Sequence, residues 1–540
     1  MNSSIKTLFA FAAVAAGVLA ASCSKENAVV KEFTATMEQC TEQDGKTTLY
    51  DNTLYWQQGD QIKVYGNGGG YGIYTANNVG GATTFALTSG NPGSSSYTAI
   101  YPASAGNDDG TIELPAVQMS NDGSLTGFPM YAISDNTDLN FMHLCGVLRL
   151  RLQKSGVSVS AIEITSDVEL TGRHSVTVSE GVPSLTYVSY GEGDPHKSAM
   201  LVCSTPQSIN SQKDFYIYLP EHNYTSLCIR IYSSDGGVCT KTLNSGVTIG
   251  IRRGSIKTIT MSNSLNFTPN AGRLNGLFSV SPTKQVYFSQ GNLQFQASTG
   301  TWCLAPNQYN YVGSANSNIS STYSGWIDLF GWGTSGWNSG AVCYQPWSTS
   351  ESYSDYYPGS LGTNSLIGDY AEADWAYHNA ICNGGNAIHI WRTLTMTEWH
   401  YLIFSRTDAD AKRGPGNING VGGLIILPDS WIMPSGCSFT SGYDVHRWDG
   451  SWNDNSYTLA QWAQMEAAGA VFLPASGVRD GIRVYNQNVT GDYWLSTCSY
   501  FEEQEWPECA SIIDFYDFAV VDNNSSKYAG LSVRPVRDNN

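Results

Sequence analysis

Residues 141–152 read Phe-Met-His-Leu-Cys-Gly-Val-Leu-Arg-Leu-Arg-Leu, a stretch in which the side chains alternate in character. The even positions from 148 to 152 are all leucine, whereas the odd positions carry Val147, Arg149 and Arg151. Successive side chains of a β-strand point to opposite faces of its sheet. The alternation therefore predicts a strand over residues 141–152 with one side buried in a core.

Similar short segments recur on both sides of this strand and are separated by turns rich in Gly, Asp and Ser. They occupy residues 33–38, 47–54, 56–65, 97–102, 215–219, 227–232 and 255–261. Their number and spacing predict two β-sandwich domains, over residues 47–150 and 151–265.

The composition limits the classes of partner. The chain has 540 residues, which is more than one core normally serves, and a formal net charge of −18. A phosphate backbone would be repelled, so we expect no nucleic-acid partner. The many glycine, tyrosine and tryptophan residues are typical of mainly β domains with tight turns.

The N-terminus has the pattern of an export signal. Lys6 precedes a short apolar run over residues 8–21, which is too short to span a bilayer. The run ends in Leu-Ala-Ala-Ser-Cys at residues 19–23, which resembles a lipobox. We expect residues 1–22 to be a signal peptide and Cys23 to be lipidated in an outer-membrane lipoprotein precursor; the alternative is an ordinary signal peptide with a chance cysteine behind it.

Cysteine spacing gives no sign of a metal site. Eleven cysteines follow Cys23, without a Cys-x-x-Cys pair or a Cys/His cluster of ligand spacing. Cys498 and Cys509 bracket one loop and are a possible disulfide, with the connectivity left open. The motifs of zinc proteases, P-loop enzymes and serine hydrolases are absent, so we expect no enzyme, no metal and no cofactor.

Residues 266–275 are polar and predict a linker before a third domain at 276–540. Residues 286–288 and 293–296 predict a hairpin. Thr395 with Glu398, and Thr458 with Gln461, have the spacing of a capping box and predict helices at about 395–405 and 458–469.

Residues 30–265 resemble the fimbrillin family of pilins from anaerobic bacteria. The resemblance lies in the lipobox and in ordered blocks at 33–38, 56–65, 97–102 and 141–152. It implies transthyretin-like sandwiches whose precursor is cut after a basic residue, so that the first strand is lost and a neighbouring subunit donates a replacement. The matching residue is Lys46, with Lys31 as the alternative; uncut, Lys46 would be a solvated loop residue and the lipidated segment 23–46 would be kept.

Residues 276–537 resemble C-type-lectin-like domains of the formylglycine-generating-enzyme and Fibrobacter major paralogous group. The blocks are Trp-Arg-Thr-Leu-Thr-Met-Thr-Glu-Trp at 391–399, Ala-Val-Phe-Leu-Pro-Ala at 470–475, Gly-Asp-Tyr-Trp-Leu-Ser-Thr at 491–497 and Gly-Leu-Ser-Val-Arg-Pro-Val-Arg at 530–537. The resemblance implies a mixed α+β domain with a binding face on its last strands and the loop between them.

The residues themselves support a binding face there. Alternation over 510–516 puts Ile513 and Phe515 on a buried side. Aromatic residues are frequent at binding hot spots, and three glutamates interleave with those of the preceding loop. The residues expected to bind a ligand are Tyr500, Phe501, Trp506, Ile512, Asp514 and Tyr516; the alternative is that the aromatic residues pack beneath the loop.

These expectations combine into a surface adhesin. The chain ends directly after a strand that its last domain needs, which favours a pilus tip subunit that accepts a donor strand and gives none. Its partners would be other pilin subunits and an unknown glycan or protein ligand. The alternative is a surface-anchored lipoprotein that binds polysaccharide or protein outside a pilus.

Overall fold

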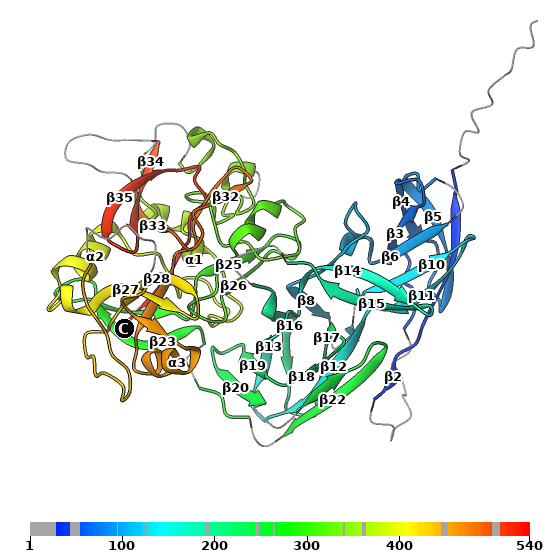
Figure 1. Ribbon diagram of the computed structural model, residues 1–540, viewed down its shortest axis with the longest axis horizontal. Coiled ribbons are helices and arrows are strands. Elements are labelled where there is room, and N and C mark those ends of the chain that lie inside the picture. Colours follow the sequence, from blue (N-terminus) through cyan, green and yellow to red (C-terminus); the bar gives the residue numbers. More distant parts are fainter. Residues whose placement is uncertain are drawn as a thin grey trace, which may run out of the picture.

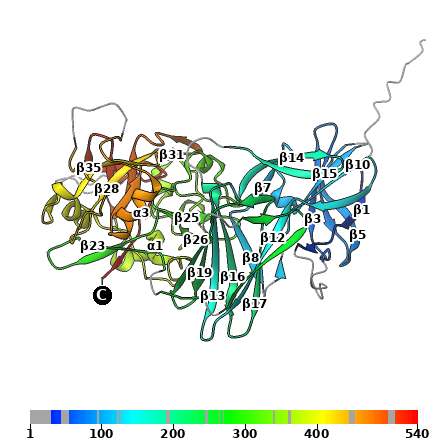
Figure 2. The same cartoon turned by 60° about the horizontal axis from the view of Figure 1, so that its bottom comes forward.

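The computed structural model shows a mainly β chain arranged as three units in a row, in chain order, from the N-terminal unit to the C-terminal one (Figures 1 and 2). The structure describes residues 29–43, 54–93, 96–121, 124–125, 127–189, 195–243, 248–262, 265–268, 271–338, 341–358, 363–443, 452–498 and 508–539. Within these ranges no helix is both long and apolar enough to cross a membrane.

The first unit is a closed barrel and not the expected two-sheet sandwich. Its strands, in barrel order, are β1 (Glu32–Met37), β11 (Asp138–His143), β10 (Met130–Ser134), β6 (Tyr97–Tyr101), β3 (Gln61–Gly66), β4 (Tyr71–Ala76) and β5 (Ala82–Gly90). Trp56 fills the interior, with its ring edge-to-face against Phe85, Tyr101 and Phe141 at 5.0–5.3 Å. Closure occurs because β1 pairs on both sides, with β5 and with β11.

The second unit is a sandwich of two sheets. One sheet contains β17 (Lys213–Pro220), β12 (Cys145–Gln153), β22 (Ser255–Ser262) and β2 (Thr41–Glu42). The other contains β20 (Val238–Leu243), β19 (Leu227–Ser233), β13 (Ser158–Ser166), β16 (Ser198–Ser208), β8 (Val117–Asn121) and β9 (Ser124–Leu125). Small flanking sheets are β15 (Val182–Tyr187), β14 (Gly172–Ser179) and β7 (Ile112–Leu114), and β18 (His222–Tyr224) with β21 (Ile249–Ile251). The expected boundary between residues 150 and 151 lies inside β12.

The segment 141–152 is two strands and not one. β11 ends at His143 in the barrel, and β12 begins at Cys145 in the sandwich. The crossing leaves no room for a side chain beside Gly146, where a Cβ would lie 2.2 Å from the carbonyl oxygen of Arg252. The leucines at 148–152 are buried in the sandwich core as predicted, but the opposite face is covered too, because Val147 and Arg149 are also buried.

The C-terminal unit mixes small sheets with short helices. Its sheets are β23 (Arg273–Ser279), β24 (Gln285–Ser289) and β36 (Val536–Asp538); β25 (Leu293–Gln296) and β26 (Thr301–Leu304); β29 (Ser456–Tyr457), β27 (Arg413–Ile418), β28 (Val421–Ile426) and β30 (Val471–Pro474); β31 (Val478–Asp480) and β32 (Arg483–Tyr485); and β33 (Gly491–Cys498), β34 (Cys509–Phe515) and β35 (Val520–Ser526). The helices are α1 (Trp375–His378), α2 (Met396–His400) and α3 (Leu459–Ala467). Short helical turns along the chain are η1 (Ala103–Ala105), η2 (Pro195–Lys197), η3 (Gly313–Asn318), η4 (Val342–Tyr344), η5 (Tyr353–Asp355), η6 (Gly368–Ala373), η7 (Tyr401–Ser405) and η8 (Asp410–Lys412).

Both predicted capping boxes are confirmed. Thr395 and Glu398 cap α2 reciprocally, and Thr458 and Gln461 cap α3 in the same way. The predicted hairpin is wrong, because β24 pairs with β23 and β36, whereas β25 pairs with β26.

Apolar contacts join the three units. Ile112, Phe128 and Tyr218 belong to a cluster between barrel and sandwich. Met200 and Tyr232 of the sandwich form another cluster with residues of the C-terminal unit, among them Trp326.

Candidate functional site

The first strand is the central element of the barrel's packing. β1 runs antiparallel to β5 and parallel to β11, so it supplies hydrogen bonds to two neighbours at once. Phe33 is fully buried, with its ring edge-to-face against Tyr74 and Tyr97 at 4.9 Å, and Ala35 is buried beside it. Removal of β1 would leave two unpaired strand edges and an apolar slot.

The same segment continues into the sandwich, where two carboxylates hold it. Glu38 accepts hydrogen bonds from both Arg253 guanidinium nitrogens, at 2.6 and 3.2 Å, and from the backbone N–H of His143 at 2.9 Å. Burial alone would raise the pKa of Glu38, but these hydrogen bonds lower it below its ordinary value. Farther along, β2 pairs with β22, and Glu42 lies 2.9 Å from the buried Arg149.

The slot that the segment with β1 and β2 fills is therefore apolar at one end and charged at the other. Apolar side chains fill the barrel end, at Phe33 and Ala35, and carboxylates meet arginines at the sandwich end, at Glu38 and Glu42. Lys31 is exposed just before β1. Cys23 and Lys46, the predicted lipidation and cleavage residues, lie outside the described residues.

The strand predicted over residues 510–516 is present as β34, but the exposure expected of Ile512 and Asp514 is wrong. The three-stranded sheet of β33, β34 and β35 lies between two cores, so both of its faces are covered. Ile512 is 2% exposed in one core, whereas Ile513 and Phe515 belong to the other. Tyr516 is half-buried and stacks on Phe518 at 5.2 Å. Tyr500, Phe501 and Trp506 lie outside the described residues.

Asp514 takes part in a carboxyl pair. It stands directly opposite Asp492 in the ladder between β33 and β34, and it is 4% exposed. Burial and the neighbouring Asp514 raise the pKa of Asp492 to about 7, and burial raises that of Asp514 as well. Thr490 donates a hydrogen bond to Asp492 at 2.8 Å.

The possible disulfide is wrong, because neither Cys498 nor Cys509 takes part in a disulfide bond. Cys498 stands opposite Ala510 in the ladder, so the side chain of Cys509, one residue away, points to the other face of the sheet. The Cys498 thiol instead lies 3.6 Å from the Cys509 carbonyl oxygen. Burial and the adjacent Glu508 raise the pKa of Cys509, which disfavours the reactive thiolate.

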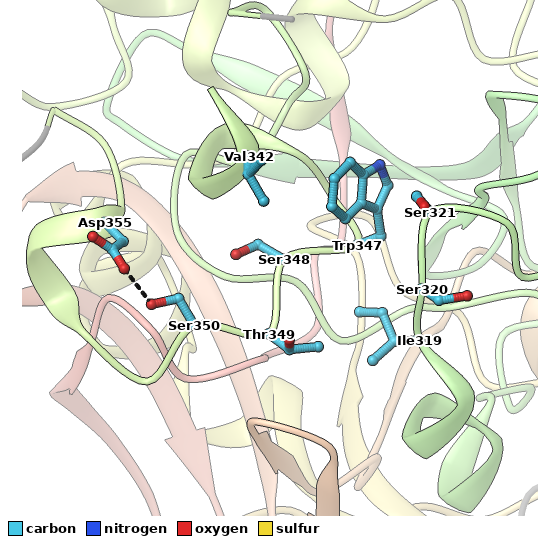
Figure 3. A pocket seen from close by; sticks show the side chains of 9 residues that line it. All are labelled: Ile319, Ser320, Ser321, Val342, Trp347, Ser348, Thr349, Ser350 and Asp355. Carbon is cyan, nitrogen blue, oxygen red and sulfur yellow. Dashed lines mark hydrogen bonds between the residues drawn. The ribbon is translucent and has the colours of Figure 1, made fainter. Parts of the chain in front are cut away.

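A pocket that the sequence did not indicate lies on the C-terminal unit, in the irregular stretch after β26. Its volume is about 570 Å³, within the usual range of small-molecule sites. Figure 3 shows its walls, which carry hydroxyl groups, one indole and one carboxylate: Ile319, Ser320, Ser321, Val342, Trp347, Ser348, Thr349, Ser350 and Asp355. Among the lining residues that the structure describes, none is a lysine or an arginine.

Buried groups fix one wall of this pocket. The Tyr356 hydroxyl donates to the Ser350 carbonyl at 2.8 Å and accepts from the Ser348 hydroxyl at 3.2 Å. Arg479 is fully buried and donates to the carbonyls of Leu329 and Ser348 at 3.2 and 3.3 Å. These hydrogen bonds hold the backbone of residues 348–350 against Arg479 of β31 and against Tyr356.

A hydrogen bond orients Asp355, the one carboxylate among the nine described lining residues. Ser350 Oγ donates to Asp355 Oδ2 at 2.5 Å, as the dashed line in Figure 3 marks. Trp347 is half-buried and packs against the core cluster that contains Trp332 and Trp375. No periodic pattern marks this stretch, so a sequence signal for the pocket exists only in its Ser, Thr and Trp content.

Within the described ranges, no three His, Cys, Asp or Glu side chains gather as a metal site.

Comparisons with known proteins give distant structural likenesses. No protein-family model matches the chain, and no curated protein matches it. A Bacteroides ovatus structure described as a candidate cell adhesion protein is 14% identical, with 45% of this chain and 96% of that one covered and a TM-score of 0.29.

The tip fimbrial protein Mfa3 from Porphyromonas gingivalis, truncated at its C-terminus, is 10% identical over 44% of this chain and 98% of its own, with a TM-score of 0.22. A fimbrial protein from Bacteroides ovatus is 11% identical over 94% of this chain and 99% of its own, with a TM-score of 0.20. All three TM-scores are low, so the structural likeness is distant.

Proposed function

We propose that this chain is a cell-surface fimbrial adhesin, processed from an outer-membrane lipoprotein precursor, that accepts a strand from a neighbouring pilin. The observation that carries the proposal is the position of β1, which closes the barrel while the same segment adds β2 to the sandwich. Cleavage at Lys46 would separate both strands from the rest of the chain. An incoming strand would satisfy the open edges of β5 and β11 and fill the slot.

The C-terminal unit is proposed to carry the ligand-binding function, at the tip of the filament. Its own sheet uses residues 536–538, because β36 pairs with β24 and Asp538 lies 2.7 Å from Arg392. A donor role for these residues would take them out of that sheet. These residues are therefore not available as a donor strand while that sheet is intact.

The competing proposal is a surface lipoprotein that keeps its N-terminal segment. One observation favours it: the uncut segment completes both units by itself, with Phe33 and Ala35 fully buried. N-terminal sequencing of the protein from the cell surface separates the two, since a start at residue 47 supports strand exchange. A lipidated Cys23 on the surface protein, with label spread evenly over the envelope in immunogold micrographs, would favour the lipoprotein instead.

The contacts of the slot predict the composition of the donor strand. A peptide of residues 29–43 should displace the labelled, nicked segment from protein cut at Lys46. A peptide carrying Glu38→Gln and Glu42→Gln should bind about tenfold more weakly for each lost carboxylate, because each one faces an arginine. The measurement is a fluorescence displacement assay.

The matched control peptide carries Glu32→Gln, because Glu32 is exposed on the same strand. It should bind like the unaltered peptide. If the peptide that carries Glu38→Gln and Glu42→Gln binds as tightly as the control peptide, the two arginines do not select the donor strand.

A further inference from the structure

We propose that the pocket around Trp347 binds a neutral sugar ring. The proposal rests on the proposed function and deepens it by naming the class of ligand that the adhesin would take. It concerns the nine lining residues described above, which lie in a part of the C-terminal unit to which the sequence assigned no role.

The charge of the wall excludes several ligand classes. Phosphate, sulfate and carboxylate ligands are most often held by lysine or arginine, and the nine lining residues include neither. A protein site for calcium usually supplies six to eight oxygen ligands, several of them carboxylates, and Asp355 is the only acidic group among the nine. The remaining chemistry is that of an uncharged molecule rich in hydroxyl groups.

Trp347 offers the surface on which such a ring would stack. A pyranose has one face of C–H groups, which packs on the face of an aromatic ring. Figure 3 shows the indole at the pocket wall beside Ser321 and Val342. Because the ring also packs against the core, it is held in place before a ligand arrives, and little conformational entropy is lost on binding.

Hydroxyl groups and one carboxylate surround this surface. Ser320, Ser321 and Thr349 are exposed, so their hydroxyls are accessible to a ligand. Asp355 is held by Ser350 through Oδ2, which leaves Oδ1 as an acceptor for a sugar hydroxyl. Hydrogen bonds to a charged acceptor are stronger than those between neutral groups, so Asp355 should select sugars with a hydroxyl at that place.

The fixed wall adds to the expected affinity. Tyr356 and Arg479 hold the backbone of residues 348–350 through hydrogen bonds to its carbonyls. A wall that is already in its binding geometry does not need to be ordered by the ligand. The pocket is nevertheless open, since Val342 and Thr349 are exposed at its edge, which suits one residue of a longer glycan chain.

The test uses the full exported chain and a panel of methyl glycosides of glucose, galactose, mannose and N-acetylglucosamine. Binding is followed by saturation-transfer NMR, and affinities by titration calorimetry. At least one glycoside should bind. Trp347→Ala should weaken it about 30-fold, as for an aromatic hot spot, and Asp355→Asn about tenfold.

Matched control variants are Trp431→Ala and Asp369→Asn. Trp431 is half-buried in the same unit against a different core cluster, and Asp369 is an exposed aspartate of η6. Both should bind the glycoside as the unaltered chain does. Asp355 lies on the surface, so its variant keeps the proposal testable if Trp347→Ala fails to fold.

Two outcomes would overturn the proposal: no glycoside of the panel binds, or the pocket variants bind as well as the controls. A protein ligand captured by the chain in the absence of sugar binding counts against it as well. A failure of sugar binding can be told apart from a failure of strand exchange. The displacement assay with residues 29–43 measures binding to the barrel and the sandwich, and it does not involve the pocket.

Discussion

At the level of single residues, the pair Asp492 and Asp514 gives the chain a pH-dependent stability. The pKa of Asp492 rises from 3.8 to about 7 in the folded chain, so the folded state holds a proton that the unfolded state has lost. The free energy of unfolding therefore falls as pH rises from about 4 to about 7. Asp492→Asn should make this fall shallower, as measured by urea midpoints at pH 5 and pH 8.

The free energy of unfolding of Asp492→Asn should still depend on pH to some extent. Asp328 is fully buried, and burial raises its pKa to about 6, so it contributes in the same direction. Asp514→Asn is the partner variant and should lower the pKa of Asp492. If Asp492→Asn leaves the difference between pH 5 and pH 8 unchanged, the pair does not titrate as described.

At the residue scale, the sequence predicted correctly which side chains of the strand at 510–516 share a face. It did not predict that both faces are buried. Alternation correctly separated Ile513 and Phe515 from Ile512 and Asp514. It could not show that a second core covers the other face, because part of that core comes from residues far earlier in the chain, such as Trp332 and Phe330. The same limit applies to the pocket, whose walls come from irregular backbone.

At the level of elements, β1 should contribute more to the barrel than its six residues suggest. Phe33→Ala removes a fully buried ring and should cost about 3–5 kcal/mol. Because β5 and β11 both pair with β1, their amides should exchange hydrogen faster in the variant. Hydrogen-exchange mass spectrometry of the full chain measures this.

Thr34→Ala is the control for Phe33→Ala, because Thr34 is exposed on the same strand. It should leave the exchange of β5 and β11 amides close to that of the unaltered chain. Equal protection in both variants would mean that β1 does not hold the barrel closed.

Local signals predicted elements well, and pairing between elements poorly. The two capping boxes are local chemistry, and α2 and α3 begin where they predict. The hairpin at 286–296 is wrong because β24 finds its second partner in β36, about 250 residues later in the chain. The single strand expected at 141–152 is two strands for a similar reason, since its halves belong to different units.

At the level of the whole molecule, the apolar contacts between units should keep the row of three units rigid. Trp326 is 3% exposed in the cluster between the sandwich and the C-terminal unit. Trp326→Ala should open a cavity there and loosen the C-terminal unit, which small-angle X-ray scattering would detect as a larger radius of gyration. Trp337→Ala is the control, because Trp337 is 40% exposed and outside this cluster.

An unchanged scattering curve for Trp326→Ala would show that other contacts suffice to hold the units.

The mainly β class of the whole chain was predicted from composition and alternation. The closed barrel was not, because closure depends on one strand that pairs on both sides.

The closing role of Glu32–Met37 has a consequence for the journey of the polypeptide. A subunit that polymerises by strand exchange risks aggregation before assembly, because unpaired strand edges associate with one another. On the proposed function, the segment that contains β1 would travel attached to the rest of the chain and keep the edges of β5 and β11 covered until the cut at Lys46. Assembly would then be timed by a single proteolytic cut rather than by concentration.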